Sequence, residues 1–296
     1  MSLQTAIRLV ELRSCPACKS RRHRHLFNLT RFSVFECECT HRFIDPSLDS
    51  DSMMAIYQSS AHLTEINPAC RDYYEYETLN PKSQTFHDYN RALREARILA
   101  RGNELLEVGC GAGSFLKFAR QRSWKVRGVD SSRENIQKVN EEGIPGECCN
   151  YLDFDPREKL DCVVLWDLIE HPQDPERFIM KTYNLLRPGG LLVLATPHYP
   201  NLLTFLAESA YHLSGGWLKA PLGRLYMLEH TSYFSVKTLS QLLDKNGFKM
   251  LKAWKTETDL NRYYFPPVLH FVLVVSFALA RFGGWQNRMI AVARKD

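Results

Sequence analysis

A turn with three glycines in five residues constrains the fold of this chain more than any other segment. The stretch ELLEVGCGAGSFL, residues 104–116, places Gly109, Gly111 and Gly113 between a short apolar run and a helical pattern. Glycine permits the backbone conformations of a tight turn and leaves room for a ligand beside the main chain. The segment therefore predicts a strand, a ligand-binding turn and a helix, in that order.

Apolar runs and helical patterns alternate from residue 105 to the end of the chain. Strands are expected at 104–108, 125–130, 159–168, 191–197, 249–254 and 288–295, and helices at 114–122, 132–143, 174–190 and 235–246. Such alternation is typical of an α/β fold with a mostly parallel sheet, and the last two strands are suited to antiparallel pairing. A further amphipathic helix is expected from about Asn90 to Ala100.

Three regions differ in composition. Residues 1–50 are rich in Cys, His and Arg, residues 51–100 form a Tyr-rich helical linker or cap, and residues 101–296 carry the α/β pattern with apolar insertions near 199–230 and 257–285. The apolar segment 268–282 is shorter than the ~20 residues that span a bilayer, so it predicts a buried helix. The chain begins without a signal-peptide pattern and has nine cysteines, which favours reduced thiols and a cytoplasmic location.

Two acids indicate what the glycine turn binds. Glu107 lies directly before the turn, where its charge would repel a phosphate, and Asp130 ends the second strand, where a carboxylate can accept both hydroxyls of a ribose. The spacing is G-x-G-x-G, and Ser114 stands where a dinucleotide loop has its last glycine. The predicted ligand is therefore a nucleoside that carries positive charge.

This combination resembles the class I S-adenosylmethionine-dependent methyltransferases over roughly residues 90–296. The segments DLIEHPQDP, LLRPGGLLVLATP and EHTSYFSVKTLSQLLDKNGF are similar to the subgroup that includes ubiquinone-pathway O-methyltransferases. The resemblance implies a Rossmann-like, seven-stranded, mostly parallel sheet with helices on both faces and an antiparallel last strand. It implies cofactor contacts from Glu107, Gly109, Cys110, Gly111, Gly113, Asp130, Ser131, Leu152, Asp153 and Trp166.

Histidines at the strand exits are candidates for the chemistry. Methyl transfer mainly needs alignment of donor and acceptor, and a base helps when the acceptor is a hydroxyl. His171 and His198 follow two strands and are expected to line the cavity, and His230 precedes the last helix. We take His171 as the candidate base or orienting residue. Two further expectations are a cavity role for Glu170 and a cover over the cofactor from Tyr73, Tyr74 and Tyr76.

A cysteine cluster near the start of the chain has spacing suited to zinc. Cys15 and Cys18 form a C-x-x-C knuckle, and CECTH follows about twenty residues later. The pattern resembles the zinc-ribbon leaders of some class I methyltransferases, although the second knuckle is one residue short. The ligand set is then Cys15, Cys18, Cys37 and Cys39, with His41 as an alternative fourth ligand, as in the leader of some ribosomal-RNA guanine methyltransferases. Four protein ligands would make the zinc structural.

The methyl acceptor is only broadly constrained. The two apolar insertions favour a small hydrophobic acceptor, such as a quinone, polyketide, lipid or sugar-like molecule, and they also suit peripheral contact with a membrane. Seven basic residues between Arg8 and Arg31 leave open an RNA methyltransferase that grips nucleic acid with its leader. A third possibility is a protein that binds the cofactor without turning it over.

Overall fold

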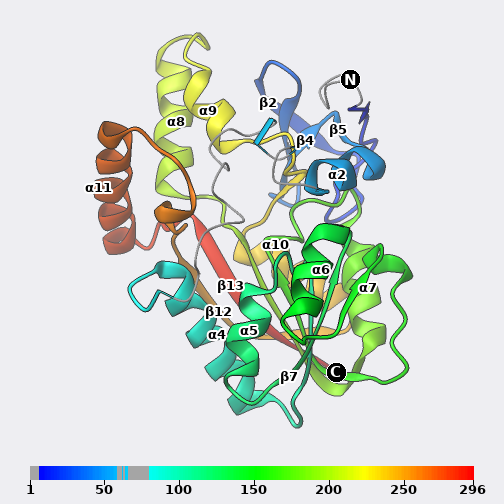
Figure 1. Ribbon diagram of the computed structural model, residues 1–296. Coiled ribbons are helices and arrows are strands. Elements are labelled where there is room, and N and C mark those ends of the chain that lie inside the picture. The colour runs from blue at the N-terminus through cyan, green and yellow to red at the C-terminus, as the bar shows by residue number, and fades with distance from the viewer. Residues whose placement is uncertain (1–6, 59–61, 63, 66–79) are drawn as a thin grey trace.

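A seven-stranded sheet forms the centre of the molecule in a computed structural model that describes residues 7–58, 62, 64–65 and 80–296 (Figure 1). Its strand order is β12-β13-β10-β9-β6-β7-β8. The strands are β6 (Glu104–Val108), β7 (Lys125–Asp130), β8 (Gly146–Cys148), β9 (Leu160–Trp166), β10 (Leu186–Pro197), β12 (Phe248–Thr256) and β13 (Arg288–Lys295). Strand β13 runs antiparallel to both neighbours and the other pairs are parallel, which confirms the predicted fold class.

Helices cover both faces of this sheet. On one face lie α4 (Gln84–Leu99), α5 (Ser114–Arg120) and α6 (Arg133–Glu141), and on the other α7 (Pro175–Leu185) and α10 (Val236–Lys245). Successive side chains of a strand point to opposite faces. Val163 of β9 accordingly joins the core beneath α7 and α10, and Val164 joins the core beneath α4 and α5. This double burial explains why residues 162–166 of β9 are apolar without interruption.

Two helix boundaries differ from the sequence prediction. Helix α7 ends at Leu185, and strand β10 already begins at Leu186, so the Pro-Gly-Gly segment belongs to the strand and not to the end of the helix. The cause is tertiary, because Leu186 pairs with Leu160 of β9. Helix α4 begins at Gln84 and not near Asn90, because the side chain of Ser83 accepts a hydrogen bond from the Phe86 amide and caps it.

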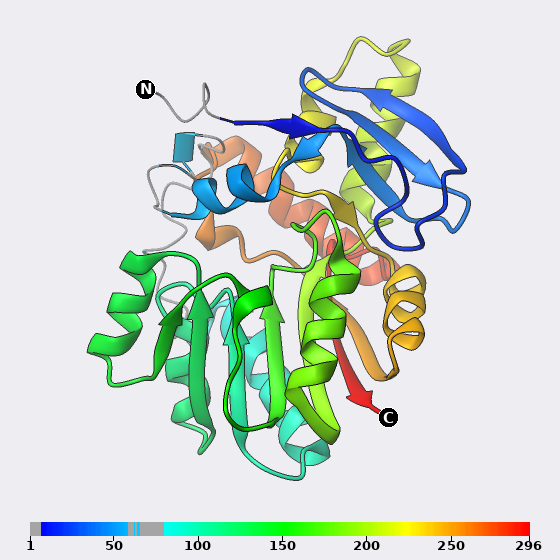
Figure 2. The same ribbon diagram turned by 90° about the vertical axis from the view of Figure 1, so that its right-hand side faces the viewer.

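The N-terminal region forms a second, smaller sheet above the carboxyl ends of the parallel strands (Figure 2). Its strand order is β11-β4-β3-β2, and β1 pairs with β5 beside it. The elements are β1 (Leu9–Val10), β2 (His23–Asn28), β3 (Ser33–Cys37), β4 (Arg42–Asp45), β5 (Ser47–Leu48), α2 (Ser50–Tyr57) and β11 (Ser232–Tyr233). Strand β11 belongs to the α/β region and is distant in sequence from the other three strands, so the α/β region completes the small sheet.

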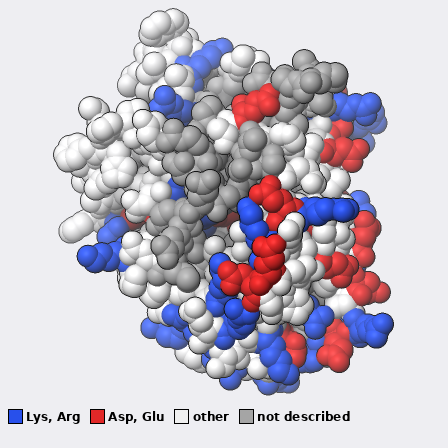
Figure 3. Space-filling model, in the orientation of Figure 1, with Lys and Arg blue, Asp and Glu red and all other residues white. Residues whose placement is uncertain are grey.

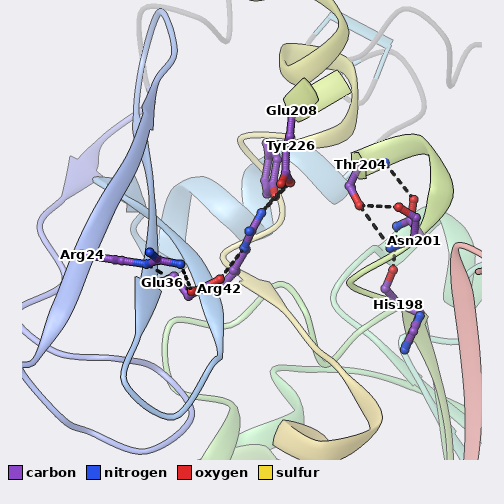
Figure 4. Close-up of polar contacts among 8 residues, drawn as sticks. All are labelled: Arg24, Glu36, Arg42, His198, Asn201, Thr204, Glu208 and Tyr226. Carbon is purple, nitrogen blue, oxygen red and sulfur yellow. Dashed lines mark hydrogen bonds and ion pairs between the residues drawn. The ribbon is translucent and has the colours of Figure 1, made fainter. Parts of the chain in front are cut away.

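A buried arginine joins the small sheet to the first apolar insertion (Figure 4). The insertion folds as α8 (Leu202–Leu213) and α9 (Ala220–Leu225). The Arg42 guanidinium donates to Glu208 at 2.5 Å, to the Tyr226 hydroxyl at 2.6 Å and to Glu36 at 3.0 Å. Two carboxylates thus compensate one buried charge. Loss of either carboxylate would leave the buried guanidinium less fully compensated.

The domain boundary that the sequence places at residue 50 remains a prediction.

The second insertion contains the short turn η3 (Leu260–Arg262) and helix α11 (Pro267–Gly283). The sequence predicted a buried helix here, and this prediction is wrong about burial. Phe277 and Ala280 are buried, whereas Phe271 and Phe282 on the outer side are 68% and 99% exposed. Among the described residues, no helix meets the length and hydropathy needed to cross a bilayer.

Candidate functional site

A cavity of about 270 Å³ lies at the carboxyl ends of β6, β7 and β9, between the sheet and the N-terminal region. The glycine turn forms its floor. Gly109 and Gly111 have φ angles of +69° and +52°, a left-handed conformation that favours glycine. Nothing lies within 4 Å of the place where a Cβ on Gly111 would sit, so the backbone is open to a ligand there.

Two carboxylates stand at this floor. Glu107 is 3% exposed, and its Oε2 atom has no hydrogen-bond partner among the described residues. Burial, and then the charge of Asp130, raise the pKa of Glu107 well above its ordinary value. Burial also raises the pKa of Asp130, against hydrogen bonds donated by the amides of Ser132 at 2.8 Å and Gly111 at 2.9 Å. The cavity therefore carries two carboxyl groups at its floor, and Arg262 also lines it. A floor of this kind suits a positively charged ligand.

Most of the predicted cofactor residues lie on the cavity wall. The wall includes Glu107, Gly109, Cys110, Gly111, Asp130, Ser131, Leu152 and Trp166. Gly113 and Asp153 are not part of it. Gly113 is the left-handed N-cap of α5, where a Cβ would meet Val139 at 3.0 Å, so its role is packing. Asp153 belongs to the short turn η2 (Tyr151–Asp153), whose Leu152 and capping residue Asn150 do line the cavity.

The roof of the cavity comes from α2, at the start of the region predicted as a helical linker or cap, although its lining residues were not predicted. Met53, Met54 and Tyr57 line the cavity from above, together with Leu48 and Ser50. Gln58 at the end of the helix donates to the Ser131 carbonyl at 3.1 Å and accepts from the Ser132 hydroxyl through its own carbonyl, also at 3.1 Å. Tyr73, Tyr74 and Tyr76, the predicted cover, lie outside the described residues. A short helix with two methionines carries no sequence signal for this role.

His171 lines the cavity, and carbonyl oxygens face both of its ring nitrogens. Its Nδ1 lies 2.7 Å from the Glu229 carbonyl and its Nε2 lies 3.0 Å from the Asp167 carbonyl. A carbonyl only accepts hydrogen bonds, so a ring nitrogen that carries a proton can donate to one of these carbonyls, and the Tyr57 hydroxyl also lies 3.3 Å from Nδ1. This arrangement leaves neither nitrogen directed at an acceptor molecule. It suits a residue that positions the loop after β9, and a role as base would require the ring to turn.

The other two histidines do not reach the cavity. His198 was expected on the wall, but it is buried against β13, where burial lowers its pKa to about 4 and its Nδ1 faces the Gln286 carbonyl. His230 stacks edge-on against His171 at 4.9 Å between ring centroids, and burial lowers its pKa well below the ordinary value. Glu170, also expected at the cavity, is buried beside them and accepts a hydrogen bond from Thr196 at 2.9 Å.

A smaller and more polar chamber of about 20 Å³ adjoins the cavity. The two share four wall residues, which are Tyr89, Trp166, Asp167 and Arg262. The chamber is completed by Thr85, Asp88, Glu257, Thr258, Asp259, Tyr263 and Arg288. Trp166, which the chamber shares with the cavity, ends β9, whereas Asp130 ends β7. Strand β6 lies between these two strands, so the chamber adjoins the end of the cavity that is farther from Asp130.

Asp167 is the central residue of this second chamber. It follows β9 with a φ angle of +49°, a strained conformation for a residue with a side chain, of the kind that functional sites retain. Arg288 pairs with it at 2.7 Å and Arg262 lies 3.9 Å from its other oxygen. Burial opposes the charge of Arg288, yet Asp167 and Asp88 outweigh burial and raise its pKa. The chamber thus holds fixed charges that can orient a polar group.

The four cysteines of the N-terminal region converge as predicted. The sulfur atoms of Cys15, Cys18, Cys37 and Cys39 all lie within 4.8 Å of one another. Two of the distances are 3.9 Å (Cys15–Cys39) and 3.5 Å (Cys18–Cys37). Four sulfurs bound at ~2.3 Å to one tetrahedral ion are about 3.8 Å apart, so the donors and their spacing fit zinc. A hydrogen bond from Cys15 lowers the pKa of the Cys39 thiol to about 5.

His41 does not belong to this group. It is fully buried against Phe234, with ring centroids 4.7 Å apart, and burial lowers its pKa to about 3. Neither ring nitrogen has a hydrogen-bond partner among the described residues. Of the two ligand sets left open by the sequence, the arrangement favours the one with Cys39.

Comparison with known proteins places the chain in a family. A methyltransferase domain family matches residues 82–253, more than half of the chain. Ubiquinone biosynthesis O-methyltransferases from Bradyrhizobium sp. and Bradyrhizobium diazoefficiens are 35% and 32% identical over 101 and 114 residues, which are 32% and 36% of this chain. The chain spans only 40% and 45% of the length of these relatives.

Solved structures share the fold. Magnesium protoporphyrin IX methyltransferase from Synechocystis, determined with bound SAH, superposes with a TM-score of 0.55 at 15% identity and covers 84% of this chain and 100% of its own. At such identity the likeness concerns the fold alone. Together with the family match over residues 82–253 and the sheet order, it shows that the chain belongs to the class I S-adenosylmethionine-dependent methyltransferases.

Proposed function

We propose that the protein transfers a methyl group from S-adenosylmethionine, bound in the large cavity, to a small molecule whose reacting end lies where this cavity meets the adjoining polar chamber. The observation that carries this proposal is the buried Glu107 carboxylate, whose Oε2 atom has no hydrogen-bond partner among the described residues. An unpaired buried carboxylate is costly, and a cationic ligand would relieve it. The positively charged amino group and sulfonium of the cofactor provide such a cation.

The other cofactor contacts follow from the cavity wall. Asp130 would accept the ribose hydroxyls, Gly109 and Gly111 would allow the cofactor to approach the main chain, and Leu152 would pack on the adenine. Cys110 and Ser131 complete this part of the wall. The roof residues Met53 and Met54 of α2 would exclude water from the methionine end, which strengthens electrostatic interactions inside.

The acceptor would reach the methyl group at Trp166 and Asp167, where the two chambers meet. Because the methyl is already activated by the sulfonium, the protein needs mainly to align donor and acceptor. The Asp167–Arg288 pair would hold the polar reacting end of the acceptor by hydrogen bonds. His171 would act as a positioning residue that fixes the backbone of Asp167 through its carbonyl. The chamber of about 20 Å³ has room for only a small polar group, so the rest of a quinol, sugar-like or similar acceptor would lie outside it.

We also propose that Cys15, Cys18, Cys37 and Cys39 hold one structural zinc. All four ligands would come from the protein, so the site would have no open position for catalysis. The ion would fix the N-terminal sheet, and that sheet carries α2 over the cavity. Lys19, directly after the first knuckle, pairs with Asp174 at the start of α7 at 2.6 Å. Arg22 and Arg24 also pair with acids, which makes a bare basic surface for RNA less favoured.

The test uses S-adenosylmethionine labelled on its methyl group, incubated with the purified protein and an extract of the source cells. We expect label in the organic-soluble or small-molecule fraction. Glu107→Gln should abolish this transfer, because its amide cannot pair with the cation. The matched control is Glu147→Gln, on the exposed side of β8, which should leave transfer unchanged.

Calorimetric titration with S-adenosylmethionine and its demethylated product separates binding from turnover. Binding of both without label in any fraction would favour a protein that holds the cofactor without turnover. Label in RNA would overturn the small-molecule acceptor. Equal binding by wild type and Glu107→Gln would overturn the assignment of the cavity.

A further inference from the structure

Exposed apolar side chains of this molecule are concentrated on one surface. Within the part of the chain that the structure describes, all the large apolar side chains that are exposed, except Val10, Ile98 and Met180, lie in residues 205–218 and 264–285. We call these exposed side chains of α8, of the loop that follows it, and of α11 with its flanks the apolar face. Monomeric soluble proteins rarely expose a contiguous apolar surface of this kind unless it binds something.

Helix α11 contributes the largest part of the apolar face. Val268, Phe271, Val275 and Phe282 recur at helical spacing on its outer side and are between 43% and 99% exposed. The inner side is narrow, with Phe277 and Ala280 buried. A helix that is apolar on all sides is expected to be enclosed. This one is open along its outer side, so a partner is required to cover it.

Helix α8 lies beside α11 and extends the apolar face (Figure 1). The two are fixed to each other, because Leu202 donates its amide hydrogen to the Trp285 carbonyl at 3.0 Å and the rings of Phe205 and Trp285 meet edge-on at 5.3 Å. Trp217, in the loop after α8, is 84% exposed. The apolar face is therefore a firm surface with aromatic residues at its ends, and such residues suit the boundary between water and lipid.

The exposed charges within the apolar face are basic. Residues 202–226 contain a single acid, Glu208, which is half-buried and paired with Arg42, and residues 263–285 contain none. Lys219 and Arg224 are exposed at the α8–α9 end, whereas Arg281 at the α11 end is paired with the buried Glu257. Figure 3 shows this side as mostly white, whereas acids and bases intermingle on the lower right. Two copies of the face would bring like charges together, whereas an anionic lipid surface would complement them.

We propose that the apolar face docks the protein on the surface of an anionic phospholipid bilayer. Helix α11 has 17 residues and is too short to span the ~30 Å hydrocarbon core, so it would lie in the plane of the interface. Helix α11 begins a few residues after Arg262 and Tyr263, which line the polar chamber. A bilayer-resident acceptor would then enter close to the chamber. This last clause rests on the proposed function, whereas docking itself does not.

The test is flotation of the purified full chain with vesicles of phosphatidylcholine alone and of phosphatidylcholine mixed with phosphatidylglycerol. We expect flotation with the anionic vesicles and weaker flotation with the neutral ones. Phe271→Glu and Phe282→Glu should each lower the partition coefficient by about tenfold or more, because each would remove a large apolar contact with the bilayer and add a charge. Met180→Glu, at an exposed apolar position of α7 on the other side of the sheet, is the matched control and should float as wild type does.

Charge is tested separately. Lys219→Gln with Arg224→Gln should reduce flotation with anionic vesicles only, and Arg157→Gln, an exposed arginine in another loop, should have no effect. Sedimentation without lipid distinguishes a second copy as the partner. A dimer that Phe271→Glu dissociates, without vesicle binding by the wild type, would overturn the proposal, as would flotation that none of the face variants reduces. Because the readout is binding to lipid, it stands even if methyl transfer is not observed.

Discussion

At the cofactor end of the sheet, charged side chains are buried, whereas along α8 and α11 apolar side chains are exposed. Glu107 is buried and Asp130 is half-buried, whereas Phe271 and Phe282 lie on the surface. Both arrangements are unfavourable in the protein alone, since a buried charge loses hydration and an exposed apolar surface orders water. The comparison teaches that each region is arranged for something absent from the chain itself, a cation in the first and an apolar phase in the second.

The largest effect is expected from the four cysteines, a further group of side chains whose spacing suits a cation. Removal of zinc with a strong chelator should unfold the N-terminal sheet, because apparent binding energies of structural zinc reach ~10 kcal/mol or more. The roof of the cavity would be lost with it, so affinity for S-adenosylmethionine should fall in parallel. Mass spectrometry of metals and calorimetric titration measure the two quantities on the same sample.

Cys15→Ser provides the matched genetic change, and Cys148→Ser on β8, an exposed cysteine outside the group, provides its control. We expect one zinc per chain in the wild type and in Cys148→Ser, and much less in Cys15→Ser. A metal-free wild type with full thermal stability would contradict the zinc site. Full cofactor affinity after chelation would contradict the coupling to α2.

The next effect concerns Glu107 and pH. Burial raises its pKa above 4.5 in the folded protein, so the folded state holds this proton more tightly than the unfolded chain. The resulting stability is present below the unfolded pKa and is lost as pH rises through the folded pKa. Glu107→Gln should therefore be more stable than wild type at alkaline pH, while its affinity for the cofactor falls by about 100-fold.

Thermal unfolding between pH 5 and pH 9 measures this dependence, and Glu147→Gln is again the control. S-adenosylmethionine should raise the melting temperature of the wild type more at high pH than at low pH, because pairing with the cation requires ionised Glu107. A melting temperature of Glu107→Gln that falls below that of the wild type at every pH would show that the carboxylate is stabilising. The comparison with the apolar face, in which both regions are unfavourable in the protein alone, would then fail.

The two regions also differ in how far the sequence could predict them. The glycine turn, Glu107 and Asp130 are local in the chain and sit in a strand–turn–helix pattern, so their meeting at one sheet edge follows from topology. Met53, Met54 and Tyr57 reach the same cavity through the packing of a separate sheet, which no local pattern encodes. Asp167 was passed over because its neighbours Arg262 and Arg288 are distant in sequence, and the pair exists only in the fold.

Burial was the property that the sequence predicted least well. The segment 268–282 reads as a core helix by composition, and composition cannot state whether enough chain remains to cover it. His198 was expected on the cavity wall because it follows a strand, yet the strand β13 shields it. In both cases the outcome depends on a neighbouring element and not on the residue itself.

A third prediction tests the two sides of α11. Phe277→Ser should destabilise the fold by about 3 kcal/mol, because it creates a cavity and buries a hydroxyl. Phe282→Ser, five residues away and 99% exposed, should change stability by less than ~0.5 kcal/mol. Urea unfolding of the two variants measures both. A large loss in Phe282→Ser would mean that the outer side is covered in solution, for example by a second copy.

The smallest effect is expected at the roof of the cavity, where the apolar side chains would contact the cofactor and not lipid. Met54→Ala should weaken cofactor binding by about three- to tenfold, because it removes methylene and sulfur contacts without removing a charge. Asp51→Asn, exposed on the same helix and away from the cavity, should bind as wild type does. Calorimetric titration measures both variants, and flotation on anionic vesicles should be unchanged in each. Joint loss of cofactor affinity and of flotation in Met54→Ala would instead indicate that the two regions are coupled through the N-terminal sheet, because that sheet packs on α8 and also carries α2.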